Sequence, residues 1–153
     1  MSRTKPAAEL TSHLGYWLRY VSNHVSLAFA RKVEAHGVTV AEWVFLRHLL
    51  DAERMAPSQL AERMGMSRGA ISKLADRLVA KALIKRRDDP QDGRAHTLSL
   101  TAAGRTLVPK LAALADANDA EFFDHLTPKD RSKLLQILQE LVKHRGLPKP
   151  PTE

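Results

Sequence analysis

The sequence predicts a mainly α-helical fold with one small β-hairpin, and two features of its hydrophobic pattern support this prediction. Over most of the 153 residues, apolar side chains recur at intervals of three and four, which is the period of an amphipathic helix. Between residues 84 and 100 the period changes to two, and the turn-forming pair Asp92-Gly93 lies within this segment. Helices are therefore expected on both sides of a single hairpin.

Length and composition favour a single domain over residues 1–153. The hydrophobic content of 44% is enough to bury a core without disulfides. The absence of cysteine excludes disulfides, thiolate zinc sites and thiol-based redox sensing. Glu9 and His13 interrupt any apolar signal core, and 18 consecutive apolar residues occur nowhere. We therefore expect a soluble, cytoplasmic protein that does not enter a membrane.

The first two helices differ in length. Apolar positions from Leu10 to Val33 predict one helix of roughly 25 residues, about 37 Å long, which Gly37 ends. A small core does not need that length, so part of the apolar stripe should meet a second chain or the C-terminal helices. Thr39 and Glu42 predict a capping box at the start of a shorter second helix.

The next two helices have the spacing of a helix-turn-helix motif. Pro57 suits the first position of the third helix, Gly65 ends it in a tight turn, and Ser67 caps the fourth helix at once. The fourth helix places Ile71, Leu74, Ala75 and Leu78 on one face and Gly69, Ser72, Lys73, Asp76 and Arg77 on the other. In such a motif the second helix enters the major groove of DNA, and the hairpin that follows makes it a winged helix.

Two further helices are predicted after the hairpin. Thr101 caps one that continues to Phe123, with a bend expected at Pro109, which cannot donate a main-chain hydrogen bond. Thr127 and Pro128 start the last helix, which Gly146 ends.

Basic residues concentrate on the fourth helix and the hairpin. Residues 63–94 contain nine Lys or Arg against four Asp, a net charge of +5, and the whole chain has a net charge of +7. Such a surface suits a phosphate backbone, because each neutralised phosphate releases counterions. A charge run by itself is more often a solvated face, so the helix-turn-helix spacing decides between the two interpretations. The basic stretch holds no aromatic residue on which bases could stack, which favours duplex DNA over single strands. A contact that reads the shape of double-stranded RNA is the remaining alternative.

The segment PSQLAERMGMSRGAISKLADRL, followed by RRDDPQDGRAHTLSLTAAG, resembles the winged-helix core of MarR-type transcriptional regulators. The most specific matches are Asp92-Gly93-Arg94 at the wing tip and Leu100-Thr101-Ala102-Ala103-Gly104 at the exit from the hairpin. The resemblance covers approximately residues 10 to 145. It implies a homodimer held by helices within residues 9–36 and 101–146, with the DNA-binding winged helix-turn-helix over residues 38–100.

Two positions depart from the family pattern. Ala56 stands where a Ser or Thr commonly caps the third helix, a loss of about 1 kcal/mol that Pro57 partly offsets. Ala82 stands where a Gly usually ends the recognition helix. Either Ala82 adopts a left-handed conformation at about 1 kcal/mol, or the helix continues directly into the wing.

The candidate DNA-binding residues combine the outward face of the helix with the basic hairpin: Arg68, Gly69, Ser72, Lys73, Arg77, Arg86, Arg87, Asp92 and Arg94. The resemblance implies that Arg94 enters the minor groove while Asp92 helps to orient it. It also implies an effector pocket between the dimer part and the DNA-binding part. Candidates on the first two helices are Tyr16, Trp17, Tyr20, His24, Trp43 and Arg47, although aromatic residues at helical spacing ordinarily pack.

No catalytic residue, metal site or cofactor is expected. The seven histidines form no i, i+3 or i, i+4 pair, and neither a phosphate loop nor a His-Glu-x-x-His motif is present. The sequence therefore predicts a sequence-specific, duplex-DNA-binding regulator rather than an enzyme. The resemblance implies that this regulator is a homodimeric, ligand-responsive repressor that binds a pseudo-palindromic operator and a small aromatic or anionic effector. The alternative is a winged-helix protein-interaction module that binds an acidic partner.

Overall fold

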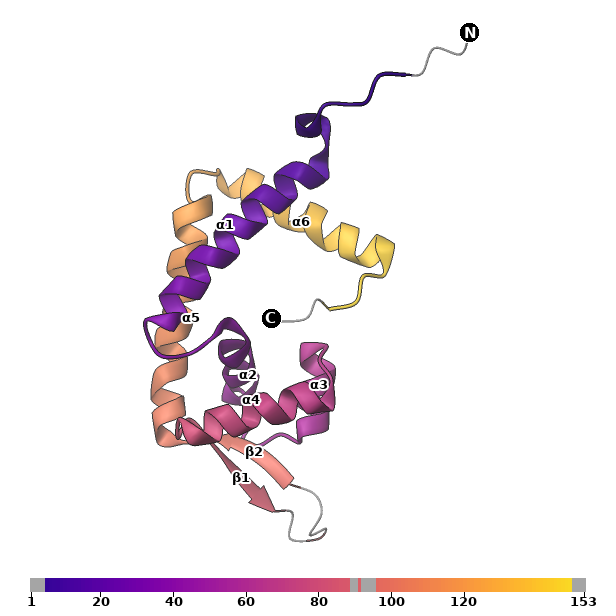
Figure 1. The fold of residues 1–153 in the computed structure, drawn as a ribbon. Coiled ribbons are helices and arrows are strands. Elements are labelled where there is room, and N and C mark those ends of the chain that lie inside the picture. The colour runs from indigo at the N-terminus through magenta and orange to yellow at the C-terminus, as the bar shows by residue number, and fades with distance from the viewer. Residues whose placement is uncertain (1–4, 89–90, 92–95, 150–153) are drawn as a thin grey trace.

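The computed structural model describes residues 5–88, 91 and 96–149 (Figure 1). After a short 3-10 turn at Leu10–Ser12, the elements are α1 (Leu14–Glu34), α2 (Val40–Leu50), α3 (Pro57–Met64), α4 (Arg68–Ala80), β1 (Ile84–Asp88), β2 (His96–Leu100), α5 (Ala102–Phe123) and α6 (Pro128–Arg145). The predicted fold class, mainly α with a small β-hairpin wing, is confirmed.

The elements form a head and a stalk (Figure 1). In the head, α2, α3 and α4 pack around the hairpin, in which Ile84 pairs with Leu100 and Asp88 with His96 in an antiparallel register. In the stalk, α1 lies along α5, and α6 turns away from the end of α5. The core belongs mainly to the head and is built from side chains such as Phe45, Leu46, Leu60, Ile71, Leu78 and Leu98. α4 is thus carried on a packed support.

The predicted helix starts are confirmed by hydroxyl caps. Thr39, Ser67, Thr101 and Thr127 each accept a hydrogen bond from the main-chain N–H three residues later, at 3.1 to 3.2 Å. The long first helix begins at Leu14, later than predicted, because His13 is extended. The capping box predicted at Thr39 is only half formed: the side chain of Glu42 is buried and bound to Lys81.

The two departures from the family pattern have local solutions. The N–H of Ala56 donates to Gln59 Oε1 at 3.1 Å, so half of a capping box forms without a hydroxyl. Ala82 is left-handed, with φ of 58°, and α4 ends before it instead of continuing into the wing. The N–H groups of Ala82 and Leu83 return to the last turn of α4, and this arrangement offsets part of the strain at Ala82.

Gly104, in the first turn of α5, joins that helix closely to the start of the wing. A Cβ atom on Gly104 would lie 2.2 Å from the carbonyl oxygen of Leu83. That oxygen accepts the N–H of Thr101 at 3.1 Å, so it cannot move aside freely. The glycine of the Leu-Thr-x-x-Gly exit is therefore required by contact between two stretches of backbone.

A buried polar group fixes α1 against α5. Asn118 is 4% exposed; its Nδ2 donates to the carbonyl of Val25 at 3.2 Å, and its Oδ1 accepts from Lys32 Nζ at 3.0 Å. Lys32 also binds Glu121 at 2.7 Å. These directional bonds define one register between the two stalk helices. Across the described residues, each helix is too short or too polar to cross a bilayer.

Candidate nucleic-acid interface

The outward face of α4 carries the residues predicted to read DNA. Arg68, Gly69, Ser72, Lys73 and Arg77 are all exposed, and Ile71, Leu74, Ala75 and Leu78 are all buried. Gly65, with φ of 63°, allows the sharp turn between α3 and α4 that leaves this face free. α4 therefore lies at the surface as a helix-turn-helix recognition helix does.

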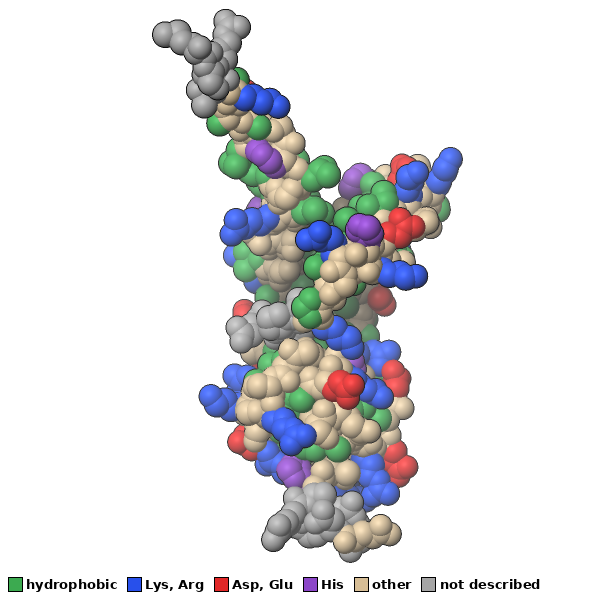
Figure 2. Space-filling model, turned by 90° about the vertical axis from the view of Figure 1, so that its right-hand side faces the viewer, with side chains coloured by type: hydrophobic (Ala, Val, Ile, Leu, Met, Phe, Trp, Pro, Cys, Tyr) green, Lys and Arg blue, Asp and Glu red, His purple; other side chains and the backbone are tan. Residues whose placement is uncertain are grey.

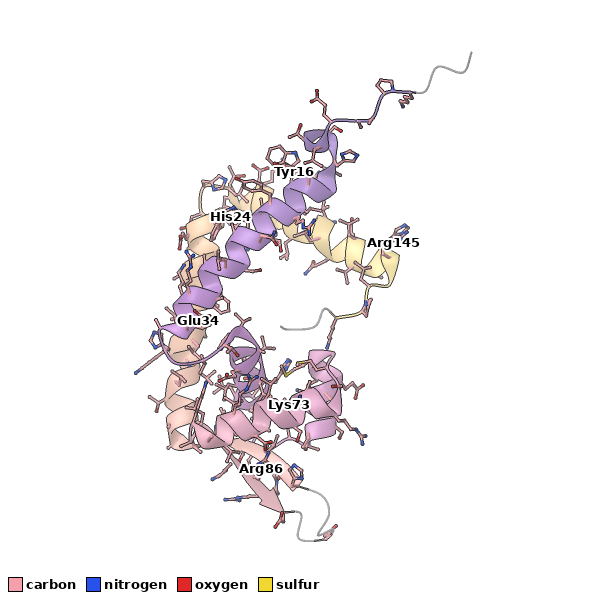
Figure 3. All side chains as sticks on the ribbon, viewed as in Figure 1. Tyr16, His24, Glu34, Lys73, Arg86 and Arg145 are labelled. Carbon is pink, nitrogen blue, oxygen red and sulfur yellow. The ribbon has the colours of Figure 1, made fainter. Side chains whose placement is uncertain are left out.

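β1 extends the basic surface next to α4 (Figure 3). Arg86 and Arg87 are both exposed on β1, and Arg86 forms an ion pair with Asp76 on the outward face of α4. This pair links the wing to α4 and neutralises an acid that would face a phosphate backbone. The predicted wing-tip residues Asp92 and Arg94 lie outside the described residues.

Lys81, one of the nine basic residues between positions 63 and 94, is paired with an acid of α2. Its Nζ donates to Glu42 Oε2 at 2.7 Å and to the carbonyl of Gly37 at 2.8 Å. Sequence reasoning missed this pair, because the partners are 39 residues apart and Glu42 fitted a local capping role. In the sequence, the pair was indicated only by Glu42, an acid at a position of α2 that otherwise apolar residues surround.

The turn before α4 contains a Gly-x-Ser-x-Gly spacing, Gly65-Met66-Ser67-Arg68-Gly69, which also occurs in hydrolase nucleophile elbows. An elbow joins a strand to a helix, whereas this turn joins α3 to α4. The Ser67 hydroxyl caps α4 by accepting from the N–H of Ala70 at 3.1 Å. Ser67 is thus a structural cap. The described residues also include no group of three His, Asp or Glu placed to hold a metal ion.

An open groove of about 1050 Å³ separates α4 from the end of α1 and the start of α2. Apolar side chains of α1, including Leu27 and Phe29, line one side, and Lys73 and Arg77 of α4 line the other. Glu34 adds one acid. The groove therefore combines an apolar wall with two cations that also belong to the candidate DNA-binding face. Its α1 lining was not predicted from the sequence.

The predicted effector residues fall into separate groups. Tyr16, Trp17, Tyr20 and His24 form a run of neighbouring rings along the N-terminal half of α1, with centroid separations of 5.0 to 6.3 Å. Figure 3 shows Tyr16 and His24 well away from the head. Trp43 packs edge-on against Phe29 at 6.4 Å, beside the groove. Arg47 pairs with Asp51 at 2.7 Å. Within one chain these six side chains do not form one pocket.

His48, on the last turn of α2, has a lowered pKa. Partial burial lowers its pKa below 6.5, and the nearby charges of Arg63, Lys149 and Arg47 lower it further. A histidine with a lowered folded-state pKa binds its proton more readily when unfolded, so its contribution to stability is lost as pH falls through the range below about 6.5. Lys149 also donates to the carbonyl of Arg63 at 3.1 Å, which ties the end of the described chain to α3.

Exposed apolar side chains lie along the stalk, among polar and basic ones (Figure 2). Every residue of α6 is exposed, and seven apolar residues between positions 134 and 147 are among the exposed large side chains. The exposed apolar residues of α1 include Leu14, Trp17, Leu18 and Val21. Surface of this extent on two helices marks an interaction site.

Comparisons with known proteins agree with this fold. The family model described as the MarR family matches residues 36–95. An HTH-type transcriptional repressor, MdtR of Bacillus subtilis, is 29% identical over 138 residues, covering 90% of this chain and 89% of its own.

Two solved structures share the fold. A mutant of Escherichia coli MarR complexed with operator DNA has a TM-score of 0.76 at 22% identity, over 88% of this chain and 99% of that one. Bordetella bronchiseptica BpsR, whose DNA binding is regulated by 6-hydroxynicotinic acid, has a TM-score of 0.76 at 22% identity, over 89% and 97%. The family match over residues 36–95, the similarity to MdtR along most of both chains and the winged helix with an exposed basic α4 agree, and together they support a MarR-type winged-helix transcriptional regulator.

Proposed function

We propose that this regulator binds a pseudo-palindromic duplex operator as a homodimer and represses transcription until a small ligand releases it. The observation that carries the proposal is the outward face of α4, where Arg68, Ser72, Lys73 and Arg77 are exposed around Gly69. α4 reads base edges in the major groove, whereas Arg86 and Arg87 on β1 bind phosphates. At the wing tip, the family resemblance implies that Arg94 binds in the minor groove and that Asp92 helps to orient it. Such a regulator acts on DNA in the cytoplasm of bacteria like those that contain its relatives.

The homodimer is supported by the surface of α6. This helix is exposed along its whole length within one chain, yet it carries Leu134, Leu135, Ile137, Leu138 and Leu141 on neighbouring positions. The same face of α6 and the exposed stripe of α1 cover each other in a second copy. A two-fold dimer then presents two α4 helices to two half-sites about one helical turn of DNA apart.

Selection of DNA from a random pool tests the proposal. The purified protein is expected to enrich duplexes with a two-fold related motif, and its affinity for them should fall steeply as salt rises. A winged-helix module that binds an acidic protein would also show salt dependence on DNA, but it would enrich no motif. Failure to enrich any motif would therefore favour the alternative function.

The groove between α1 and α4 is the proposed effector site. A small aromatic anion fits its chemistry, because Phe29 and Leu27 supply an apolar wall while Lys73 and Arg77 supply positive charge. Bound there, an anion competes with DNA for the same two cations. The regulation of BpsR by 6-hydroxynicotinic acid is consistent with a ligand of this class.

Aromatic carboxylates are therefore expected to weaken DNA binding and to change the fluorescence of Trp43, which packs against Phe29. A Trp17→Phe variant isolates this signal, since the chain has two tryptophans. Coupling is reciprocal: a ligand that weakens DNA binding tenfold must bind the DNA complex tenfold more weakly, a coupling of about 1.4 kcal/mol. Unchanged fluorescence together with unchanged DNA affinity would remove the groove from consideration.

A further inference from the structure

Lys81, the C-terminal cap residue of α4, is bound to a buried acid. Its Nζ lies 2.7 Å from Glu42 Oε2 and 2.8 Å from the carbonyl oxygen of Gly37. The Glu42 side chain is 1% exposed, and that of Lys81 is 38% exposed. Gly37 belongs to the connection between α1 and α2, and Glu42 to the first turn of α2. Lys81 therefore ties the end of α4 to the junction between stalk and head.

Two kinds of contact hold α4 to the rest of the chain. Along its length α4 is held by burial of Ile71, Leu74 and Leu78, which has no preferred direction, and by the exposed ion pair between Asp76 and Arg86 of β1. At its C-terminus, Lys81 binds Glu42 on one side, and Thr101 Oγ1 donates to the carbonyl of Ala82 at 2.7 Å on the other. The two sets of bonds fix the end of α4 from α2 and from the start of α5.

A fixed end matters because α4 acts as a lever. Its 13 residues span about 20 Å, so a rotation of about 5° at the C-terminus moves the N-terminus by about 1.7 Å. Hydrogen bonds to base edges tolerate only about 0.3 Å around their optimal length. Gly69, Ser72 and Lys73 lie in the half of α4 that such a rotation displaces most. A small error in the helix angle would therefore disturb base reading while leaving long-range attraction to phosphates in place.

We propose that Lys81 and Glu42 are positioning residues that set the angle at which α4 enters the major groove, and that neither contacts DNA. This inference rests on the proposed reading of DNA by α4. Because Glu42 is buried and acidic, it cannot itself bind a phosphate. Any effect of Glu42 on site selection must therefore act through the position of α4.

The experiment measures the affinities of Lys81→Met and Glu42→Gln for a selected duplex and a scrambled duplex over a range of salt. The affinity of each variant for the selected duplex is expected to fall about tenfold, equivalent to about 1.4 kcal/mol. Its affinity for the scrambled duplex should fall less than about twofold. The slope of log affinity against log salt should stay that of the wild type. Lys110→Met removes an exposed lysine from α5 and should change neither affinity.

Other outcomes would overturn the inference. If Lys81 bound a phosphate, Lys81→Met would flatten the salt slope by about one charge and would lower the affinities for both duplexes by the same factor. If only net charge mattered, Glu42→Gln would bind both duplexes more tightly. Combining the two substitutions should cost little more than either one alone, because both break the same contact. Full additivity would show that they act separately.

A second pair of variants separates positioning from folding. The double variant Glu42→Met/Lys81→Met removes both charges of the pair. Its melting temperature should be higher than that of either single variant, because apolar side chains can replace an ion pair without leaving one charge buried and unpaired. It lacks the directional bonds, so selectivity should stay low, whereas Lys81→Arg should retain most of it. Recovery of selectivity in the double methionine variant would contradict the inference. If the wild-type protein itself bound the selected and scrambled duplexes equally well, that result would instead contradict the proposed function.

Discussion

Replacing Ile137 and Leu141 on α6 with glutamate is expected to convert the proposed dimer into monomers. The two side chains are 44% and 46% exposed in a single chain and lie one turn apart on the apolar stripe of α6. A second copy that covers this stripe would have to bury four carboxylates, each at a cost of several kcal/mol. Light scattering of the full-length variant should give the mass of one chain.

DNA binding should weaken together with assembly. Two linked heads bind two half-sites more tightly than one head by about 10² to 10⁴ fold, and the monomer loses this gain. The variant Gln136→Glu/Gln139→Glu adds the same charge to the polar side of α6 and should remain a dimer with wild-type affinity. A dimer of the Ile137→Glu/Leu141→Glu protein with unchanged DNA binding would show that α6 does not form the interface.

The parts of the fold that depend on local chemistry were predictable from the sequence. A hydroxyl cap needs only the residue itself and a main-chain N–H three positions later, so Thr39, Ser67, Thr101 and Thr127 defined their helices correctly. The outward face of α4 followed from the helical period in the same way. The register of the hairpin was less constrained, because Ser99 is buried with Leu98 and Leu100 instead of alternating with them.

Features that depend on contacts between distant elements were not predictable. The motif glycine Gly104 is explained only when the carbonyl of Leu83 is seen beside it. For Ala82, the sequence left two conformations open, and the bonds that close the end of α4 decide between them. The groove likewise needs the relative placement of α1 and α4, which no pattern within either helix encodes. The effector candidates chosen by resemblance lie on α1 and α2 in separate places, so within one chain they do not form one pocket.

The second large effect concerns the division of labour between α4 and the wing. Lys73→Ala should lose about 1 to 3 kcal/mol on the selected duplex and little on a scrambled one, because a lysine that reads a base edge contributes chiefly at its own site. Arg94→Ala should lower the affinities for both duplexes by a similar factor and flatten the slope of log affinity against log salt by about one charge. Asp92→Ala should resemble Arg94→Ala, although it removes a negative charge.

The ratio of affinities for selected and scrambled duplexes tests most directly whether α4 reads the sequence of duplex DNA. Wild-type protein should prefer the selected duplex by about 10³ fold or more at physiological salt. Lys73→Ala should reduce this ratio, whereas Arg94→Ala should leave it nearly unchanged while lowering both affinities. A wild-type ratio near one, or a ratio that Lys73→Ala leaves unchanged and Arg94→Ala abolishes, would contradict the assignment of base reading to α4.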